Sequence, residues 1–548
     1  MNQLSYKLLT SLEKVFPKKE PTGEAMETTI TGLKGETLSF QLAYCWNMDY
    51  KGSAKIILSS PIAEQVQIRT VELVPCEYPC HPNHDDNYLV TEPGMYPDRL
   101  ASLPNNQIIG LIPEQWRSLW IDITTTDLQA GNYPITITLQ NGETTYASAE
   151  VTCDILDAVL PPLSIPHTEW FHSDCLANYY NVEVFSEEHW RIVENFIRKA
   201  VKRGCNMILT PVFTPPLDTA IGGERRTVQL VDVKVCENDQ YAFDFTKFAR
   251  WVTICKDCGV QYIEISHLFS QWGAYATPKI MGEKNGELCK IFGWDTKAAG
   301  EEYKNFLTQF LTALKVELKR LDIEKNTYFH ISDEPAMYQL DSYRAAKEIV
   351  TSVLDGYQTF DALSDYAFYE QGLVAQPVCA IDHIQPFLEN RPEKLWTYYC
   401  TAQGRTVTNR FIAMPSTRTR ILGTQLYKYN LDGFLQWGYN FYNAQFSVTP
   451  IDPYRCTDAD RAFPSGDAFL VYPGKDGIPE DSIRSMLMEQ TMADYRAMKY
   501  LEQLTDRDTV LACIEPEGGE PVTLEDYPKT ISAMTALRGR INEAIKNA

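Results

Sequence analysis

Hydrophobic and polar residues alternate along most of the first 160 residues. Short stretches with this period-two pattern are separated by turn residues, and they lie at 28–44, 54–60, 66–78, 115–126 and 131–140. Strict alternation is typical of strands that have one buried face and one face in water. Several such strands with turns between them predict an N-terminal β-sandwich domain over residues 1–160.

The pattern changes after a proline-rich linker that contains Pro161, Pro162 and Pro166. Short apolar runs then alternate with longer stretches of helical periodicity. The eight apolar runs are 167–171, 205–213, 261–269, 327–335, 357–365, 378–387, 395–400 and 433–440. The clearest helical stretches are 187–203, 245–258, 301–321, 341–354 and 417–430. Helices of this length between strands imply parallel strands, and eight such units predict a (β/α)8 TIM-type barrel.

The fifth and sixth units lack a long helical stretch, so a doubly wound sheet is the structural alternative. Another helical stretch, 481–505, follows a segment rich in glycine and proline. The predicted organisation is therefore multidomain, with a sandwich over 1–160, a barrel over 165–505 and a short C-terminal helical appendix over 506–548. A chain of 548 residues is too long for one ordinary core, which agrees with several domains.

Charge and composition narrow the range of partners. The formal net charge is −22, and a surface this acidic repels nucleic acid and anionic lipid. No apolar stretch is long enough for a membrane span, and the N-terminus has neither the apolar run nor the cleavage site of a signal peptide. The 14 cysteines follow no fixed spacing and are expected to be reduced thiols of a cytoplasmic protein. The oligomeric state is not predicted.

Polar and aromatic side chains gather at the ends of the predicted barrel strands, where barrels of this type place functional residues. The candidates are His172, Asp174, His267, Trp272, Asp361, Asp365, Asp382, His383, Gln385, Tyr398, Tyr399, Trp437, Tyr439 and Asn440. Aromatic residues make up 12% of the chain, which suits stacking on the CH faces of sugars but suits a large aromatic core equally well. Together these side chains predict a carbohydrate-binding mouth.

The sharpest feature is the pair Asp333 and Glu334 in "YFHISDEPAM", because two adjacent carboxylates end an apolar run. Cleavage of a glycosidic bond needs a carboxylic acid to protonate the leaving oxygen, and burial would keep that acid protonated near neutrality. Pro335 is expected to hold Glu334 extended. Adjacent residues of a regular strand point to opposite faces, so both act together only if the strand splays at its end. The alternative is a solvated pair that caps the helix near 341.

Other patterns are weighed as metal or redox sites. Cys76, Cys80, His81 and His84, with Asp85 beside them, could hold zinc, but their spacing is not that of a standard zinc site. The segment "CKDC" at 255–258 ends a helix, where the dipole does not activate a thiol. The sequence has no GxSxG elbow, P-loop or dinucleotide-binding glycine pattern, and His330 is expected to be a packed residue. No metal or cofactor is therefore predicted.

Several long stretches resemble glycoside hydrolase family 123 and the wider DUF4091-type group that shares its C-terminal domain. They are "HISDEP", "LWTYYC", "TNRFI", "RTRILGTQLYKYNLDGFLQWGYN" and "GDAFLVYPGKDGIPEDSIRSMLMEQTMADYRAMKYL", which lie in order between about 330 and 505. "GETLSFQLAY" and "GMYPDRL" are similar to the sandwich domain that precedes the barrel in that group.

The resemblance implies a retaining exo-glycosidase of β-N-acetylgalactosaminidase type, in which the substrate's own 2-acetamido group attacks the anomeric carbon. Asp333 would orient the acetamido nitrogen, and Glu334 would be the general acid and then the base. Tyr398 or Tyr399 would bond the acetamide oxygen, and Trp437 would stack beneath the sugar of an oligosaccharide or glycoconjugate. Two alternatives stay open: a glycosidase for another sugar with a direct carboxylate nucleophile, and a non-catalytic carbohydrate-binding barrel.

Overall fold

The alternating N-terminal stretches form two five-stranded sheets that pack face to face. A computed structural model describes residues 3–23 and 26–548 of the chain. One sheet has the order β1-β3-β8-β5-β6 and the other β2-β10-β9-β4-β7. The strands are β1 (Leu4–Thr10), β2 (Thr29–Lys34), β3 (Thr37–Trp46), β4 (Gly52–Ser59), β5 (Val66–Cys76), β6 (Gly94–Ser102), β7 (Ile108–Leu111), β8 (Trp116–Thr124), β9 (Gly131–Asn141) and β10 (Thr144–Val159).

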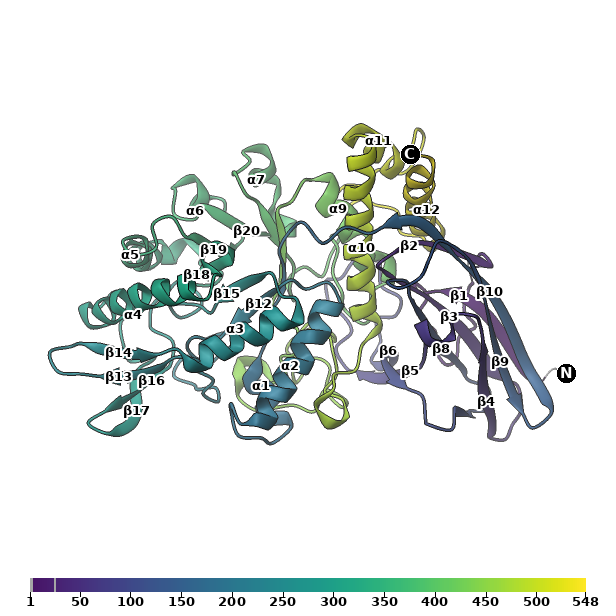
Figure 1. Cartoon of the computed structure of the whole chain (residues 1–548), viewed down its shortest axis with the longest axis horizontal. Helices are drawn as coiled ribbons and strands as arrows, with labels where there is room; N and C mark the ends of the chain where they lie inside the picture. Colours follow the sequence, from purple (N-terminus) through teal and green to yellow (C-terminus); the bar gives the residue numbers. More distant parts are fainter. Residues whose placement is uncertain (1–2, 24–25) are drawn as a thin grey trace.

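Both sheets contribute to one hydrophobic core. Leu42 on β3 and Ile121 on β8 pack with Ile56 on β4 and Ile137 on β9, and all four side chains are buried. The N-terminal part of the chain is therefore a β-sandwich, as the alternation predicts (Figure 1). Strand β10 ends at Val159, just before the proline-rich linker.

The eight predicted apolar runs form a closed parallel barrel in chain order. Its strands are β11 (His167–Glu169), β12 (Met207–Thr210), β15 (Tyr262–Ile265), β18 (Thr327–His330), β19 (Gln358–Leu363), β20 (Gln376–Ala380), β21 (Trp396–Tyr398) and β22 (Gly433–Gln436). The last strand pairs with the first, so the sheet has no free edge. The barrel prediction is confirmed, and the doubly wound alternative is wrong.

Helices follow the barrel strands, both in the five stretches where the periodicity predicts them and in three short segments where it does not. They are α1 (Ser173–Tyr179), α2 (Glu187–Lys202), α3 (Thr246–Cys258), α4 (Glu301–Arg320), α5 (Leu340–Thr351), α6 (Ala367–Glu370), α7 (Gln385–Glu389), α8 (Ser416–Arg420) and α9 (Leu422–Lys428). The predicted helix 417–430 is split at Ile421. The fifth and sixth units carry only the short helices α6 and α7, which explains their weak helical signal.

Helix α2 illustrates how local sequence sets these boundaries. The Ser186 hydroxyl caps its first turn by accepting a hydrogen bond from the His189 backbone N–H. Trp190, Val193 and Ile197 form its buried face. The chain leaves the helix through Gly204, whose φ of +97° few other residues adopt easily.

A small four-stranded sheet projects from the barrel loops and was not predicted. It has the order β14-β13-β16-β17, and Figure 1 shows it at the far end from the sandwich. Its strands are β13 (Asp232–Val235), β14 (Tyr241–Asp244), β16 (Ile280–Lys284) and β17 (Glu287–Phe292). They are short and rich in charged residues, so their alternation does not stand out from loop sequence.

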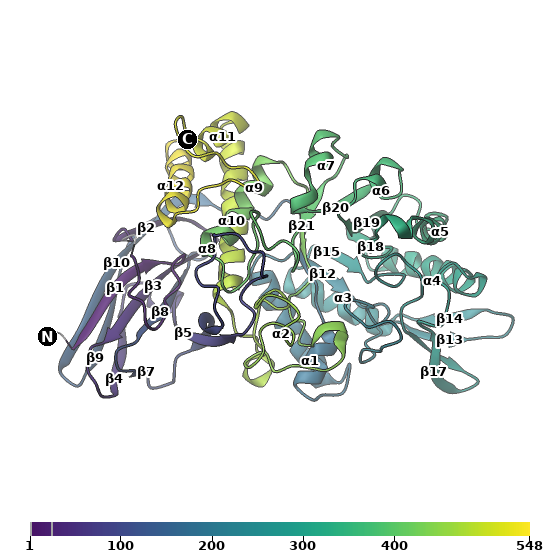
Figure 2. The same ribbon diagram turned by 180° about the vertical axis from the view of Figure 1, so that it is seen from behind.

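Helix α10 (Ile483–Leu504) lies between the sandwich and the barrel (Figures 1 and 2). The Asp481 carboxylate, just before α10, accepts hydrogen bonds from Arg69 of the sandwich at 2.6 Å and from Arg203 of the barrel at 2.8 Å. Helices α11 (Arg507–Ile514) and α12 (Ile531–Asn547) follow. Because α12 lies against β2 and β10, the C-terminal helices also hold the two domains together. None of the helices in the described residues is both long and apolar enough to cross a membrane.

Candidate active site

Asp333 and Glu334 lie in one cavity of about 140 Å³ at the carboxyl end of the barrel. The cavity is lined by Trp170, Leu217, Asp218, Gln271, Trp272, Asp333, Glu334, Ala362, Tyr398, Cys400, Thr401, Leu435, Trp437 and Phe463. These residues come from the carboxyl ends of several barrel strands and from the loops that follow them. Barrels of this type place their reactive groups in the same way.

The backbone at Glu334 differs from the prediction. The φ angle of Glu334 is +39°, in the left-handed region, so the expectation that Pro335 holds it extended is wrong. Hydrogen bonds from neighbouring strands explain this geometry. The Glu334 N–H donates to the Ala362 carbonyl at 3.1 Å, and the Trp272 N–H donates to the Asp333 carbonyl at 2.8 Å. The left-handed turn interrupts the strand alternation, and both adjacent side chains line the same cavity.

The two carboxylates differ in their hydrogen bonding. The Tyr398 hydroxyl donates to Glu334 Oε1 at 2.5 Å. The Asp333 carboxylate accepts no hydrogen bond from any residue that the structure describes, although its side chain is buried. Glu334 is therefore held in place, whereas the oxygens of Asp333 are available to a ligand.

Burial raises the pKa of both carboxyl groups. The pKa of Asp333 lies well above its usual value because of burial and the neighbouring Glu334, while His330 opposes the shift. Burial also raises the pKa of Glu334, and the Tyr398 hydrogen bond reduces that rise. Two adjacent carboxylates, of which Asp333 is buried and Glu334 half-buried, resist losing both protons, so the pair retains a proton to higher pH than isolated carboxyl groups do.

A buried network lies under the pair. The His330 Nε2 is 2.6 Å from Glu264 Oε1, and its Nδ1 is 3.5 Å from Asp361 Oδ1. Burial by itself would lower the pKa of His330, but the two carboxylates raise it to about 9. Trp170, which lines the cavity, donates to Glu264 at 2.7 Å. His330 is thus a packed residue, as predicted, and it connects the cavity wall to the strand that carries Asp333.

The catalytic barrel of this chain matches a known family of enzymes. A family model described as the catalytic domain of glycoside hydrolase family 123 matches residues 170–501, more than half of the chain. The chain belongs to glycoside hydrolase family 123. It is therefore a glycoside hydrolase that acts on carbohydrate, and the alternative of a non-catalytic barrel is set aside.

Among solved structures, the chain is similar to a family 123 glycoside hydrolase from Clostridium perfringens, described in a structural study of glycolipid glycan hydrolysis. The TM-score is 0.75 at 15% identity, and the match covers 100% of this chain and 98% of that one. This likeness shows a shared fold across both domains. A GH5 xyloglucanase from Bacteroides ovatus and a GH2 β-galacturonidase from Eisenbergiella tayi match at 8% and 9% identity with TM-scores of 0.29. They cover 89% of this chain in each case, and 100% and 97% of their own chains. No curated protein matches the chain.

Trp272, Tyr398 and Trp437 of this family 123 enzyme, which the sequence predicts as binding residues, line the cavity beside the carboxylate pair. The Trp437 indole N–H donates to Asp467 Oδ2 at 3.0 Å. Burial raises the pKa of Asp467 to about 7. The indole ring is therefore fixed from behind and its position does not depend on a ligand.

His172, Asp174 and Asn440, which the sequence predicts as sugar-binding residues, do not line this cavity. Arg225 donates to Asp174 Oδ1 at 2.6 Å and lies 3.1 Å from His172 Nδ1. The second ring nitrogen of His172 donates to the Trp437 carbonyl at 2.9 Å, and burial lowers the pKa of this ring to about 3. Asn440 holds the His172 backbone at 2.8 and 3.1 Å. These polar groups satisfy one another and support Trp437.

His267, Tyr399 and Tyr439 also lie outside the cavity. The His267 ring stacks on His330 at 4.2 Å, below the pair, and neither of its nitrogens has a hydrogen-bond partner among the described residues. The Tyr399 hydroxyl donates to Met488 Sδ at 3.5 Å and the Tyr439 hydroxyl to the Phe196 carbonyl at 3.0 Å. Tyr399 faces away because it follows the inward-facing Tyr398.

Sequence reasoning missed Trp170, Asp218 and Gln271 as cavity residues. Asp218 has a φ of +39°, and its carboxylate accepts a hydrogen bond from the Phe446 N–H at 2.9 Å. Burial raises the pKa of Asp218 to about 6. Asp218 and Gln271 lie in loops, where no periodic signal marks an inward-facing side chain. Trp170 belongs to a predicted strand, and its position at the strand end was the available signal.

The candidate zinc ligands make other contacts. His81 lies 2.7 Å from the Tyr78 hydroxyl and 2.6 Å from the Thr401 carbonyl, and His84 lies 2.7 Å from the Asp85 carbonyl. Within residues 3–23 and 26–548, no group of three or more His, Cys, Asp or Glu side chains could hold a metal ion. All 14 cysteines are free thiols.

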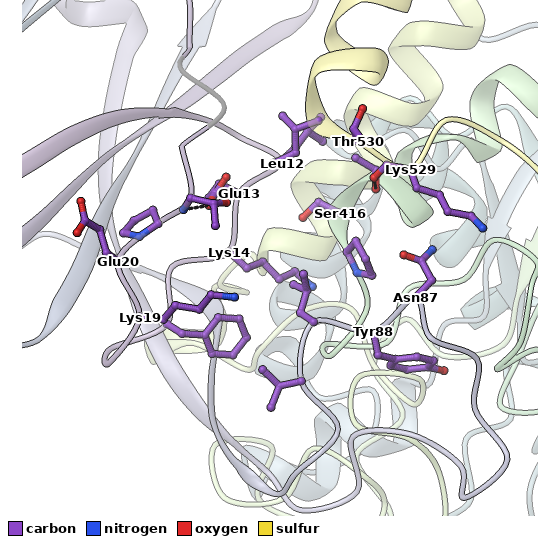
Figure 3. A pocket seen from close by; sticks show the side chains of 18 residues that line it. Leu12, Glu13, Lys14, Lys19, Glu20, Asn87, Tyr88, Ser416, Lys529 and Thr530 are labelled. Atoms are coloured by element: carbon purple, nitrogen blue, oxygen red, sulfur yellow. Dashed lines mark hydrogen bonds between the residues drawn. The ribbon is translucent and has the colours of Figure 1, made fainter. Parts of the chain in front are cut away.

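A second cavity, of about 340 Å³, lies where the N-terminal segment meets the barrel and the C-terminal helices (Figure 3). Two of its charged side chains, Lys14 and Glu13, are held by backbone groups. Lys14 Nζ donates to the Ile412 and Met414 carbonyls at 2.7 and 2.8 Å, and Glu13 accepts from the Thr22 N–H at 3.2 Å. Burial lowers the pKa of Lys14 to about 8. This cavity is a domain junction and has no carboxylate pair like that of the barrel.

Proposed function

We propose that this glycoside hydrolase is a retaining exo-glycosidase of β-N-acetylgalactosaminidase type, in which the 2-acetamido group of the substrate is the nucleophile. The observation that carries the proposal is that the adjacent Asp333 and Glu334 both line one cavity. A nucleophile that belongs to the substrate removes the need for a second carboxylate across the glycosidic bond.

In the first step the acetamide oxygen attacks C1, the bond from C1 to the leaving oxygen breaks, and Glu334 gives its proton to that oxygen. Asp333 accepts a hydrogen bond from the acetamide N–H and stabilises the positive charge of the oxazolinium ion. In the second step the water oxygen attacks C1, Glu334 takes a proton from that water, and the bond from C1 to the acetamide oxygen breaks, which restores the acetamido group. Two displacements at C1 leave the anomeric configuration unchanged.

Tyr398 has a different role from the one expected. Its hydroxyl already donates to Glu334 at 2.5 Å, so we assign it to the positioning of the general acid. Tyr399 faces away from the cavity and has no role in binding the acetamide. Trp437 lines the cavity with its indole ring fixed by Asp467, which supports stacking against the sugar.

The size of the cavity supports action on a terminal residue. Its volume of about 140 Å³ is small beside the roughly 300–1,000 Å³ of ordinary ligand pockets. A single sugar unit suits such a space better than a run of several units. Because the similar Clostridium perfringens enzyme hydrolyses glycolipid glycans, we take a glycoconjugate glycan or a short oligosaccharide as the substrate class.

Substitution of the pair tests the proposal. Asp333→Asn and Glu334→Gln should each lower turnover of an aryl β-N-acetylgalactosaminide by about 10²–10⁴-fold, because each removes one proton-handling or charge-stabilising group. The far-ultraviolet circular dichroism spectrum of each variant should match that of the wild type, which shows that the fold is retained. Full activity of Glu334→Gln would overturn the assignment of the general acid.

A second candidate function rests on Asp218, another carboxylate that lines the cavity. It could be a direct nucleophile toward a sugar that has no acetamido group. Inhibition by a thiazoline analogue of N-acetylgalactosamine distinguishes the acetamido mechanism from the direct nucleophile. Tight competitive inhibition supports the acetamido mechanism, whereas cleavage of other aryl glycosides without inhibition supports the direct nucleophile.

A further inference from the structure

The sandwich loop, defined as residues 77–93 between β5 and β6, reaches the rim of the catalytic barrel. It contacts the rim segment, defined as residues 400–407 after β21. His81 Nε2 lies 2.6 Å from the Thr401 carbonyl, the Tyr88 hydroxyl donates to the Gly404 carbonyl at 2.7 Å, and the Thr406 N–H donates to Asp85 at 2.6 Å. Three side chains of one domain thus hold one short segment of the other.

The rim segment forms part of the cavity wall. Cys400 and Thr401 both line the cavity that contains the carboxylate pair. The Thr401 hydroxyl is buried and has no hydrogen-bond partner in the part of the chain that the structure describes. Buried hydroxyls are rarely left unpaired, and leaving one unpaired costs free energy. This part of the wall therefore carries a polar group that forms no hydrogen bond within the described residues.

The orientation of the His81 ring is fixed on several sides. A carbonyl oxygen only accepts, so Nε2 donates to Thr401, and Nδ1 then accepts from the Tyr78 hydroxyl at 2.7 Å. The ring also packs closely on Gly404, where an added Cβ would lie 3.0 Å from His81 Cδ2. The Tyr78 carbonyl in turn accepts from the Ser465 N–H at 2.7 Å, beside the cavity residue Phe463.

We propose that Thr401 belongs to the sugar-binding wall of the active site and that His81 of the sandwich is its positioning residue. The proposal rests on the proposed function only in taking this cavity as the site where sugar binds. The residues that resemble a zinc motif in the sequence would then serve substrate binding from the neighbouring domain. The sandwich domain would then contribute to substrate binding in the active site as well as pack against the barrel.

The first test is the steady-state kinetics of His81→Ala. The substrate is the aryl glycoside that the wild type cleaves fastest in a panel. Loss of one hydrogen bond that places the wall should raise KM about 3- to 10-fold, with kcat changed less than twofold. His81→Gln keeps a side-chain N–H donor and should restore most of the loss. His84→Ala is the matched control, since His84 bonds only within its own loop.

A double-mutant cycle asks whether His81 acts through Thr401. Thr401→Ala should raise KM, and Thr401→Ser, which retains the hydroxyl, should stay near the wild type. If His81 places the Thr401 side chain, His81→Ala should add little in the Thr401→Ala background. Fully additive effects on KM would overturn the proposal, as would a His81→Ala enzyme with the KM of the wild type.

Hydrogen–deuterium exchange of the full chain gives a readout that needs no substrate. The amides of 400–407 should exchange faster in His81→Ala than in His84→Ala or the wild type, and equal exchange would contradict the role of His81. The identity of the cleaved sugar separates this proposal from the proposed function. Activity on a sugar without an acetamido group would overturn the acetamido mechanism. The double-mutant cycle of His81 and Thr401 could still be measured with that sugar, so it would test the role of His81 separately.

Discussion

Replacing Tyr398 by phenylalanine removes one oxygen atom next to the general acid and leaves the ring in place. In the wild type the Tyr398 hydroxyl donates to Glu334 at 2.5 Å, and this bond favours the charged form of the carboxyl group. The pKa of Tyr398 itself lies well above its usual value, because of burial and of Glu334, so the hydroxyl stays protonated throughout an ordinary assay range. The Tyr398 hydroxyl therefore contributes no ionisation of its own to the pH profile.

The size of the effect follows from the strength of the bond. A hydrogen bond to a charged group contributes about 1.5–3 kcal/mol, and about 1.36 kcal/mol corresponds to one pKa unit. Loss of the bond should therefore raise the pKa of the Glu334 carboxyl by about 1–2 units. The general acid would keep its proton to higher pH, so the alkaline limb of kcat/KM should move upward by the same amount.

The assay is the pH dependence of kcat/KM, which reports ionisations of the free enzyme. Tyr399→Phe is the matched control, because its hydroxyl contacts Met488 on the outer side of the barrel wall. Its profile should superimpose on that of the wild type. A Tyr398→Phe profile that is unchanged, or that moves to lower pH, would refute the assignment of Glu334 as the acid that Tyr398 holds.

Two further predictions concern stability. Burial raises the folded-state pKa of Asp333 above its unfolded value, so the wild type loses stability as pH rises from about 4 through that raised pKa. Asp333→Asn should therefore melt about 1–3 °C higher than the wild type at pH 8 but not at pH 4, and an equal difference at both pH values would contradict this. Asp174→Ala leaves the Arg225 guanidinium buried without its carboxylate and should cost about 3–5 kcal/mol in urea unfolding. Lost activity with unchanged stability would instead mean that Asp174 contacts the sugar.

The strands and long helices of the barrel could be predicted because each carries a local signal. The run 205–213 is apolar and bounded by Gly204, and α2 has both a serine cap and a regular buried face. The small sheet that includes β13 and β14 carries no such signal. Its strands of four to six residues are too short for alternation to be distinguished from chance, and tertiary contact with the barrel loops decides their structure.

Some residues of the candidate site could likewise be predicted from the sequence, and others could not. Asp333 and Trp437 follow barrel strands, and the fold alone brings their side chains to the cavity. The segment "LWTYYC" is apolar on both faces, as barrel strands are, so the sequence cannot tell whether Tyr398 or Tyr399 points inward. Thr401 and Asp218 could not be predicted, because loops distant in the sequence bring them to the cavity and loop residues carry no periodicity.

Several residues that line this cavity have a strained backbone. This strain helps to choose between the acetamido mechanism and a direct carboxylate nucleophile. Asp218, Trp272 and Glu334 all have positive φ angles, and such residues cost about 1–3 kcal/mol each and persist only where the surrounding structure enforces them. At Glu334 the strain places the side chain on the same side as Asp333. A direct nucleophile needs a carboxylate on the opposite side of the sugar from the acid, and adjacent residues on one wall do not meet that need. Among the described cavity residues only Asp218 remains for that part, so the strained pair is better explained by a nucleophile that the substrate brings with it.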